Sequence, residues 1–176
     1  MKPYVVTDDD RLWLLRAVAA EGAYALDVAR ALVNLFVWSK RKAPALTLET
    51  LVRSYAVPVN PRRAPGGDLF ERENPGEAIG ARRVAAAQRM TFPRHVVYAV
   101  KQALAPGYAY RSNVLDYAAP DHDATHGGKR PQYKPVTSRR AGVNRLWTRD
   151  ASWRGYRVTM GGELVPADSE GERDVG

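Results

Sequence analysis

The feature that most constrains this fold is an almost uniformly apolar segment near the N-terminus. From about residue 25 to 42, aliphatic and aromatic side chains fall on nearly every side of a helix: Val28, Leu32, Leu35, Phe36 and Val37. A helix that is apolar all round is buried on all sides, so the segment predicts a central helix with other elements around it. The cations of Lys40–Lys42 suit the negative end of that helix, and Pro44 prevents its continuation.

Further helices are expected around the central one, which makes the fold class mainly α. Thr7, followed by three aspartates ending at Asp10, forms a capping-box pattern and predicts a first helix that ends at Glu21. Thr47 caps a short helix over residues 48–55, and two more helices are expected over 75–90 and 91–104. Residues 57–76 contain four prolines and predict a long irregular loop.

The helical pattern ends near residue 104. The tyrosine-rich stretch 108–120 predicts a short strand or an extended segment, and a loop follows to residue 137. Residues 139–157 hold six arginines together with Trp147, Trp153 and Tyr156, which predicts a hairpin or an arm docked on a neighbouring protein, since Arg and Trp are favoured interface anchors. Residues 161–176 are polar and acidic and are expected to be disordered or held by a partner. We therefore expect a domain over 1–137, and a basic arm with an acidic tail over 138–176.

Composition narrows the classes of function. The 176 residues carry a net charge of +8, which attracts polyanions such as nucleic acid, teichoic acid or a peptidoglycan surface. The absence of cysteine excludes disulfides, thiolate zinc sites and a cysteine nucleophile. Three aspartates by residue 10 do not fit a secretory signal, and no apolar run approaches the roughly 20 residues that span a bilayer. We expect another component to carry the chain to any substrate in the cell wall.

Glu21 is the leading candidate for chemistry. It lies between small residues at the expected end of the first helix. Partial burial and the negative helix C-terminus both disfavour a carboxylate there, so they would raise its pKa towards the range of a general acid. A surface glutamate with no function is the alternative that spacing alone leaves open.

Four stretches appear in a recognisable order. L-W-L-L-R-A-V-A-A-E-G ends on Glu21 and Gly22, and D-V-A-R-A-L-V-N-L-F-V-W-S-K follows. T-L-E-T-L-V-R-S-Y-A-V-P-V-N-P-R spans residues 47–62, and N-V-L-D-Y-A-A-P spans 113–120. Together, over about residues 8–120, they resemble the lysozyme-like cell-wall hydrolases of the spore-cortex-lytic and phage-tail type. The resemblance implies a lysozyme-like helical domain that cuts bacterial peptidoglycan with Glu21 as its acid. It also implies a location in a phage tail, or in the host cytoplasm before release, with action on the periplasmic cell wall. In a phage particle, the protein that the arm 139–157 contacts would be a virion tail protein.

A glycan groove needs aromatic rings and hydrogen-bonding groups. The expected lining residues are Tyr24, Tyr55, Asn60, Tyr110, Asn113 and Tyr117, although ordinary half-buried packing remains open for each tyrosine. A hydrolase would also need a second carboxylate at roughly 5 to 10 Å from the acid. Glu49 and Asp116 are the candidates, and no feature of the sequence favours either of them. A lytic transglycosylase needs no such partner, because the 6-hydroxyl of the sugar attacks; we therefore favour a transglycosylase over a muramidase.

Other readings of the sequence are weaker. His122 and His126 have the spacing of zinc ligands on a helix, but Pro120 and Gly127 argue against a helix there. No metal or other cofactor is expected. A structural tail protein with a lysozyme-like fold and no activity is the main alternative. Nucleic-acid binding through the arginine-rich region is another, without a recognisable reading motif.

Overall fold

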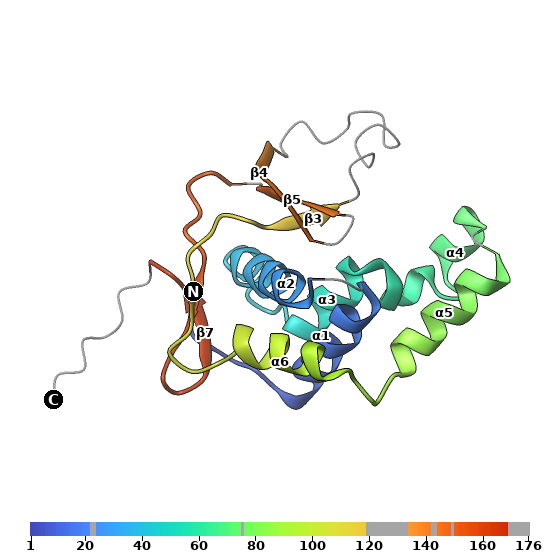
Figure 1. Ribbon diagram of the computed structural model, residues 1–176, viewed down its shortest axis with the longest axis horizontal. Coiled ribbons are helices and arrows are strands. Elements are labelled where there is room, and N and C mark those ends of the chain that lie inside the picture. Colours follow the sequence, from blue (N-terminus) through green and yellow to red (C-terminus); the bar gives the residue numbers. More distant parts are fainter. Residues whose placement is uncertain (22–23, 75, 119–133, 142–143, 149, 169–176) are drawn as a thin grey trace, which may run out of the picture.

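The computed structural model describes residues 1–21, 24–74, 76–118, 134–141, 144–148 and 150–168, and within these it describes the side chains outside 116–147. The fold is mainly α, as predicted (Figure 1). The helices are α1 (Asp8–Glu21), α2 (Ala25–Lys40), α3 (Leu48–Tyr55), α4 (Asp68–Glu73), α5 (Glu77–Gln88) and α6 (Arg94–Ala103). Short 3-10 helices, η1 (Val57–Val59) and η2 (Pro61–Arg63), follow α3.

Two small antiparallel sheets accompany the helices. One has the order β1 (Tyr4–Val5), β7 (Glu163–Pro166), β6 (Tyr156–Val158) and β2 (Ala109–Tyr110). The other has the order β3 (Asp116–Ala118), β5 (Asn144–Thr148) and β4 (Lys134–Ala141). The first sheet therefore joins the two ends of the described chain.

The central helix predicted from the apolar segment is α2. Eleven of its 16 residues are buried, Leu32 and Phe36 completely. It contacts α1 and α6, and it also contacts β3 and β4 of the second sheet. Figure 1 shows α2 between that sheet and α6. Its position explains why no side of this helix needed to be polar.

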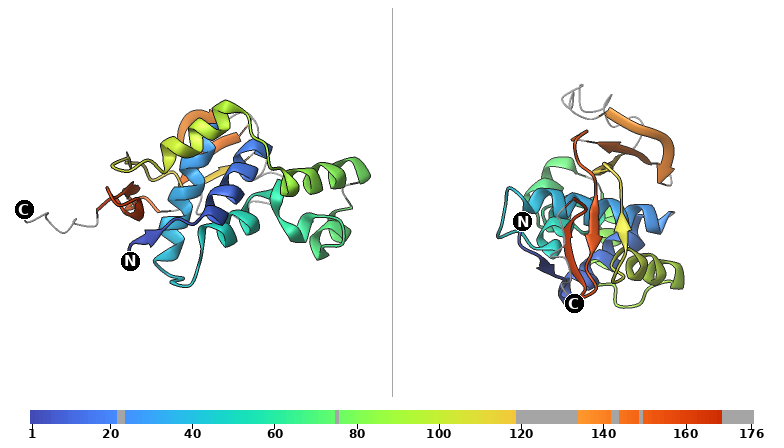
Figure 2. Two further views of the ribbon diagram at one scale, coloured as in Figure 1. Left: turned by 90° about the horizontal axis from the view of Figure 1, so that it is seen from below. Right: turned by 90° about the vertical axis from the view of Figure 1, so that its left-hand side faces the viewer.

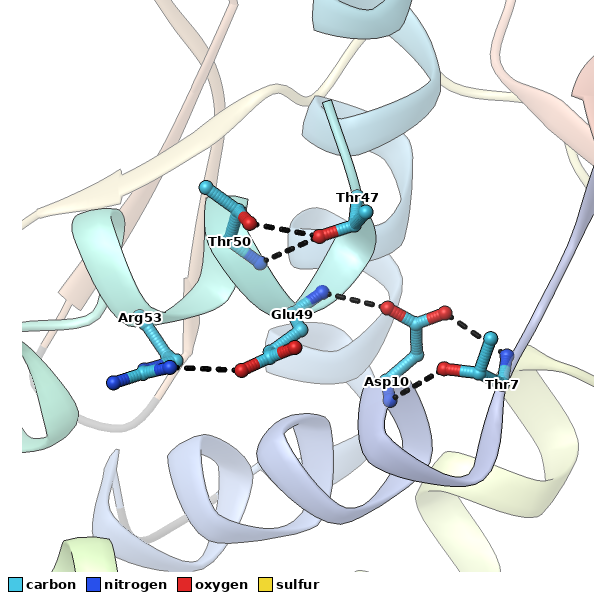
Figure 3. A network of polar contacts seen from close by, with 6 residues as sticks. All are labelled: Thr7, Asp10, Thr47, Glu49, Thr50 and Arg53. Atoms are coloured by element: carbon cyan, nitrogen blue, oxygen red, sulfur yellow. Dashed lines mark hydrogen bonds and ion pairs between the residues drawn. The ribbon is translucent and has the colours of Figure 1, made fainter. Parts of the chain in front are cut away.

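The start of α1 is fixed by the predicted capping box. The Asp10 backbone N–H donates to Thr7 Oγ1 (3.1 Å), and the Thr7 N–H donates to Asp10 Oδ2 (2.9 Å). Asp10 also reaches the start of α3, because the Glu49 N–H donates to Asp10 Oδ1 (2.7 Å) (Figure 3). Thr47 caps α3 by accepting from the Thr50 N–H. One buried carboxylate thus satisfies N–H groups at the starts of two helices.

We expect Asp10→Asn to lower the free energy of unfolding by about 2 to 4 kcal/mol, because an amide replaces an acceptor-only carboxylate that faces donors on both oxygens. Urea unfolding followed by circular dichroism measures the change. Asp9→Asn is the matched control, since Asp9 is exposed in the same turn. A loss for Asp10→Asn no larger than that of the control would contradict the dual capping role.

Tyr4 connects β1 to the same carboxylate. Its hydroxyl donates to Asp10 Oδ2 (2.8 Å) and accepts from the Leu48 N–H (3.3 Å). Burial, followed by the hydrogen bond to Asp10, raises the pKa of Tyr4 from 10.0 to about 12. Burial also raises the pKa of Tyr156, whose hydroxyl donates to the Ala103 carbonyl oxygen.

These tyrosines predict a loss of stability at alkaline pH. Because the pKa of Tyr4 is higher in the folded state, its contribution is complete below about pH 10 and disappears as the pH rises towards about 12. Urea unfolding at pH 9 and at pH 11.5 measures the loss. Tyr4→Phe should show a smaller loss than the wild type, with the remainder due in part to Tyr156. Equal losses in the two proteins would contradict the assignment to Tyr4.

Residues 57–76 do not form the predicted irregular loop. They contain η1, η2 and α4, and α4 and α5 extend together from one side of the molecule (Figures 1 and 2). The turns form because Pro58 and Pro61 stand in the first turns of η1 and η2, where a missing N–H is harmless. Prolines that predicted an irregular loop therefore stand at the starts of short helices.

The predicted boundary at residue 137 is also wrong for the described residues. Trp153 and Tyr156 are 5% and 0% exposed and belong to the core, so neither is an anchor for a partner protein. Glu163–Pro166, expected in an acidic tail, is strand β7. Gly155 has φ +103°, and a Cβ there would lie 1.8 Å from the Tyr110 carbonyl oxygen, so the approach of β6 to β2 requires glycine. Strands β4 and β5 do pair as a hairpin; the side chain of Trp147 lies outside the described residues.

No helix in the described part of the chain has the length and apolar character needed to cross a membrane.

Candidate active site at the end of helix α1

Helices α1 and α3 lie side by side and run in the same direction. At their starts, the Glu49 N–H donates to Asp10. One turn later, the Arg53 guanidinium lies 4.5 Å from the centre of the Trp13 ring. The next element, η1, contacts both α1 and α5. This parallel arrangement brings the C-terminal end of α3 towards the C-terminal half of α1.

Glu21 is the last residue of α1, as predicted, and is partly buried. The last turn of α1 contains no basic residue to balance the negative helix end. The carboxylate therefore occupies a position that the helix dipole does not favour.

Tyr24 lies at the entrance to α2, three positions after Glu21 in the sequence. It is the N-cap residue and adopts a left-handed conformation, with φ 61° and ψ 44°. Its carbonyl oxygen accepts from the Asp27 and Val28 N–H groups, while its side chain makes no cap hydrogen bond. The ring is 61% exposed. A bulky residue with positive φ is uncommon and costs energy, and such strain is concentrated at functional sites. Tyr24 is thus an exposed residue in a strained conformation, three positions after the candidate acid.

Tyr55 ends α3 and packs against the core while remaining partly exposed. Asn60 differs from the prediction, because it is only 6% exposed. Its Nδ2 donates to the Ser54 carbonyl oxygen (2.8 Å), and its Oδ1 accepts from the Arg62 N–H (2.9 Å). Asn60 therefore holds the V-P-V-N-P turn beside α1, and its place in the motif is structural.

Tyr110 lies beside the first two turns of α2. The Arg30 guanidinium lies 5.5 Å from the Tyr108 ring centre and 5.6 Å from that of Tyr110. Burial is the main cause that raises the pKa of Tyr110, and its ring lies 5.8 Å from that of buried Tyr156. Tyr110 is thus packed more deeply than a lining residue of an open groove.

The charged pair beneath these rings was not predicted from the sequence. Asp27 is 7% exposed, and its Oδ1 lies 3.9 Å from Arg30 Nη1. Among the described residues, the buried Nε of Arg30 has no hydrogen-bond acceptor. A carboxylate followed three residues later by arginine is common on helix surfaces, so the sequence does not reveal that Asp27 is buried and that Arg30 lies against Tyr110 of β2.

The remaining candidates are more distant or lie outside the described residues. Asn113 is half-buried on the segment between Ser112 and Val114, whose carbonyl oxygens bind Asn34 in the middle of α2. Asn34 is nine residues beyond Ala25, about 13 Å along the helix. The side chains of Tyr117 and Asp116, and all of His122 and His126, lie outside the described residues.

Metal ligands do not gather in the described part of the chain, where no group of three or more acidic or histidine side chains is placed to hold an ion. His95 is exposed on α6.

Glu49 does not meet the geometry expected of a second catalytic carboxylate. Its backbone lies at the level of Asp10, and its side chain pairs with Arg53 at 2.8 Å. Glu21 lies eleven positions after Asp10 in α1, which is about 16 Å along the helix. The separation exceeds the roughly 5 to 10 Å that glycoside hydrolysis needs.

Comparison with known proteins adds no family to this description: no family model, curated protein or solved structure matches the chain.

Proposed function

We propose that this protein is a phage-associated peptidoglycan glycosidase in which Glu21 is the general acid and base. The observation that carries the proposal is the position of Glu21 as the partly buried last residue of α1, without a basic residue in that turn. Tyr24 adds an exposed ring at the next described position. The resemblance of the four sequence stretches supplies the substrate class.

Lytic transglycosylation is favoured over hydrolysis. Glu21 would protonate the glycosidic oxygen as the bond to the anomeric carbon breaks. The resulting carboxylate would then take the proton of the 6-hydroxyl as that oxygen attacks the same carbon, which closes a 1,6-anhydro ring. One carboxyl group completes this cycle. Among the described carboxylates, the distance of Glu49 along α1 and the pairing of Asp27 with Arg30 favour a mechanism that needs no second carboxylate.

Digestion of purified sacculi by the wild-type chain, with mass spectrometry of the soluble muropeptides, tests the proposal. We expect products that end in anhydromuramic acid. Products with reducing muramic acid would make the protein a muramidase and require a second carboxylate. If no material is released from several wall types, the enzymatic proposal is wrong, and a structural protein of a phage particle becomes the better explanation.

A further inference from the structure

Helix α6 exposes a cationic face on the side of α2 opposite the β3–β5–β4 sheet (Figure 1). Its inner residues, Val96, Ala99, Val100 and Ala103, are buried in the core. Arg94, His95, Tyr98 and Lys101 are exposed. Residues 94, 98 and 101 follow the spacing of a single helix face, with His95 at its edge. We call these four residues the α6 face.

The charges of the α6 face have no local compensation. Helix α6 contains no aspartate or glutamate. Among the described residues, Arg94, His95 and Lys101 form no ion pair. Arg94 also occupies the first turn of the helix, where the dipole disfavours cations. Neither helix stability nor pairing within the described fold explains this arrangement.

Tyr98 gives the α6 face a second property. Its ring is 65% exposed, although it lies between the two permanently charged side chains. A ring in that position can pack against the carbon face of a polyol or a sugar while the flanking cations meet phosphates. Arg94 and Lys101 lie seven residues apart, about 10 Å along the helix, so they can engage separate phosphates of one chain.

We propose that the α6 face binds a phosphodiester-linked wall polymer of the teichoic-acid type. The positive charge of the α6 face favours an anionic polymer. Single-stranded nucleic acid is less suitable, because its successive bases need several aromatic rings to stack on and the α6 face has one. The choice of a wall polymer rests on the proposed function. The contact would hold the enzyme at the wall through a surface separate from Glu21.

A pelleting assay tests the binding without digestion of the wall. The full chain carrying Glu21→Gln is mixed with purified walls that bear the polymer, and with the same walls after hydrofluoric acid has removed it. We expect tighter binding to the polymer-bearing walls. Adding Arg94→Gln and Lys101→Gln should weaken that binding about tenfold and reduce the slope of log affinity against log salt by about two. Tyr98→Ala should weaken it further.

The matched control adds Arg72→Gln and Arg82→Gln instead, which remove the same charge from exposed positions on α4 and α5. This control should bind like the parent. Equal weakening by both double variants, or equal binding to stripped walls, would overturn the proposal. The proposal would also be overturned if the walls did not displace single-stranded DNA bound to the α6 face. If the wild type did not lyse walls, the proposed function would be wrong, but the binding results would still test the α6 face.

Discussion

Glu21→Gln should reduce the release of muropeptides from sacculi by roughly 10²- to 10⁴-fold, the range that a positioned general acid contributes. Glutamine has nearly the same size and shape as glutamate and can form hydrogen bonds, but it can neither donate nor accept the catalytic proton. The partly buried position at the end of α1 should tolerate this change, so circular dichroism and the unfolding midpoint should stay close to those of the wild type. Turbidity loss and soluble muropeptides give the rate.

Glu49→Gln is the matched control for that experiment. It makes the same chemical change in the first turn of α3, at the level of Asp10, which is about 16 Å along α1 from the proposed acid. Loss of the partly exposed ion pair with Arg53 should cost at most about 1 kcal/mol of stability. Lysis should therefore continue at the wild-type rate. If Glu21→Gln remains active, or if the two variants lose activity equally, Glu21 is not the acid.

Asn34→Leu should cost about 3 to 5 kcal/mol of folding free energy, the largest effect on stability that we expect from a single side chain. Asn34 is 0% exposed in the middle of α2. Its Nδ2 donates to the carbonyl oxygens of Ser112 (3.0 Å) and Val114 (2.5 Å), and its Oδ1 accepts from Trp153 Nε1 (2.8 Å). Leucine has a similar volume but would leave one donor and two acceptors unpaired in the core.

Two further variants separate the parts of this effect. The indole N–H is only a donor, so it fixes the orientation of the Asn34 amide. Asn34→Asp keeps an acceptor for Trp153 but places an oxygen against two carbonyl oxygens, so it should be as damaging as leucine. Trp153→Phe removes one bond and should cost less. Urea unfolding of the three variants measures these differences. A change below about 1 kcal/mol for Asn34→Leu would show that the hydrogen bonds of Asn34 do not stabilise the core.

The helices were predictable because their signals are local. Thr7 and Asp10 form the expected capping box, Thr47 caps α3, and the apolar segment becomes the buried α2. Each depends on residues within about four positions of one another. The position of Glu21 at the end of α1 followed from the same local pattern, which is why the candidate acid could be named from the sequence.

The sheets and the buried polar groups could not be predicted in this way. Strands β1, β2 and β6 have two or three residues, too few to show an alternating pattern. The roles of Asn34 and Trp153 depend on contacts between residues more than 75 positions apart. The same arginine and tryptophan content that suggested a docking arm instead supplies the core with Trp153, because composition does not show which side chains fold back onto α2.

The pairing of β1 with β7 also determines when the fold can be completed. Tyr4 lies opposite Leu164, so a strand that leaves the ribosome early waits for a partner made almost at the end of the described chain. Until then Asn34 lacks Trp153, and the core lacks Tyr156 and Leu164. The helices can form as they are synthesised, but closure of this sheet must be a late, long-range step. A nascent chain stalled before residue 150 should therefore remain open to proteases, whatever the state of its helices.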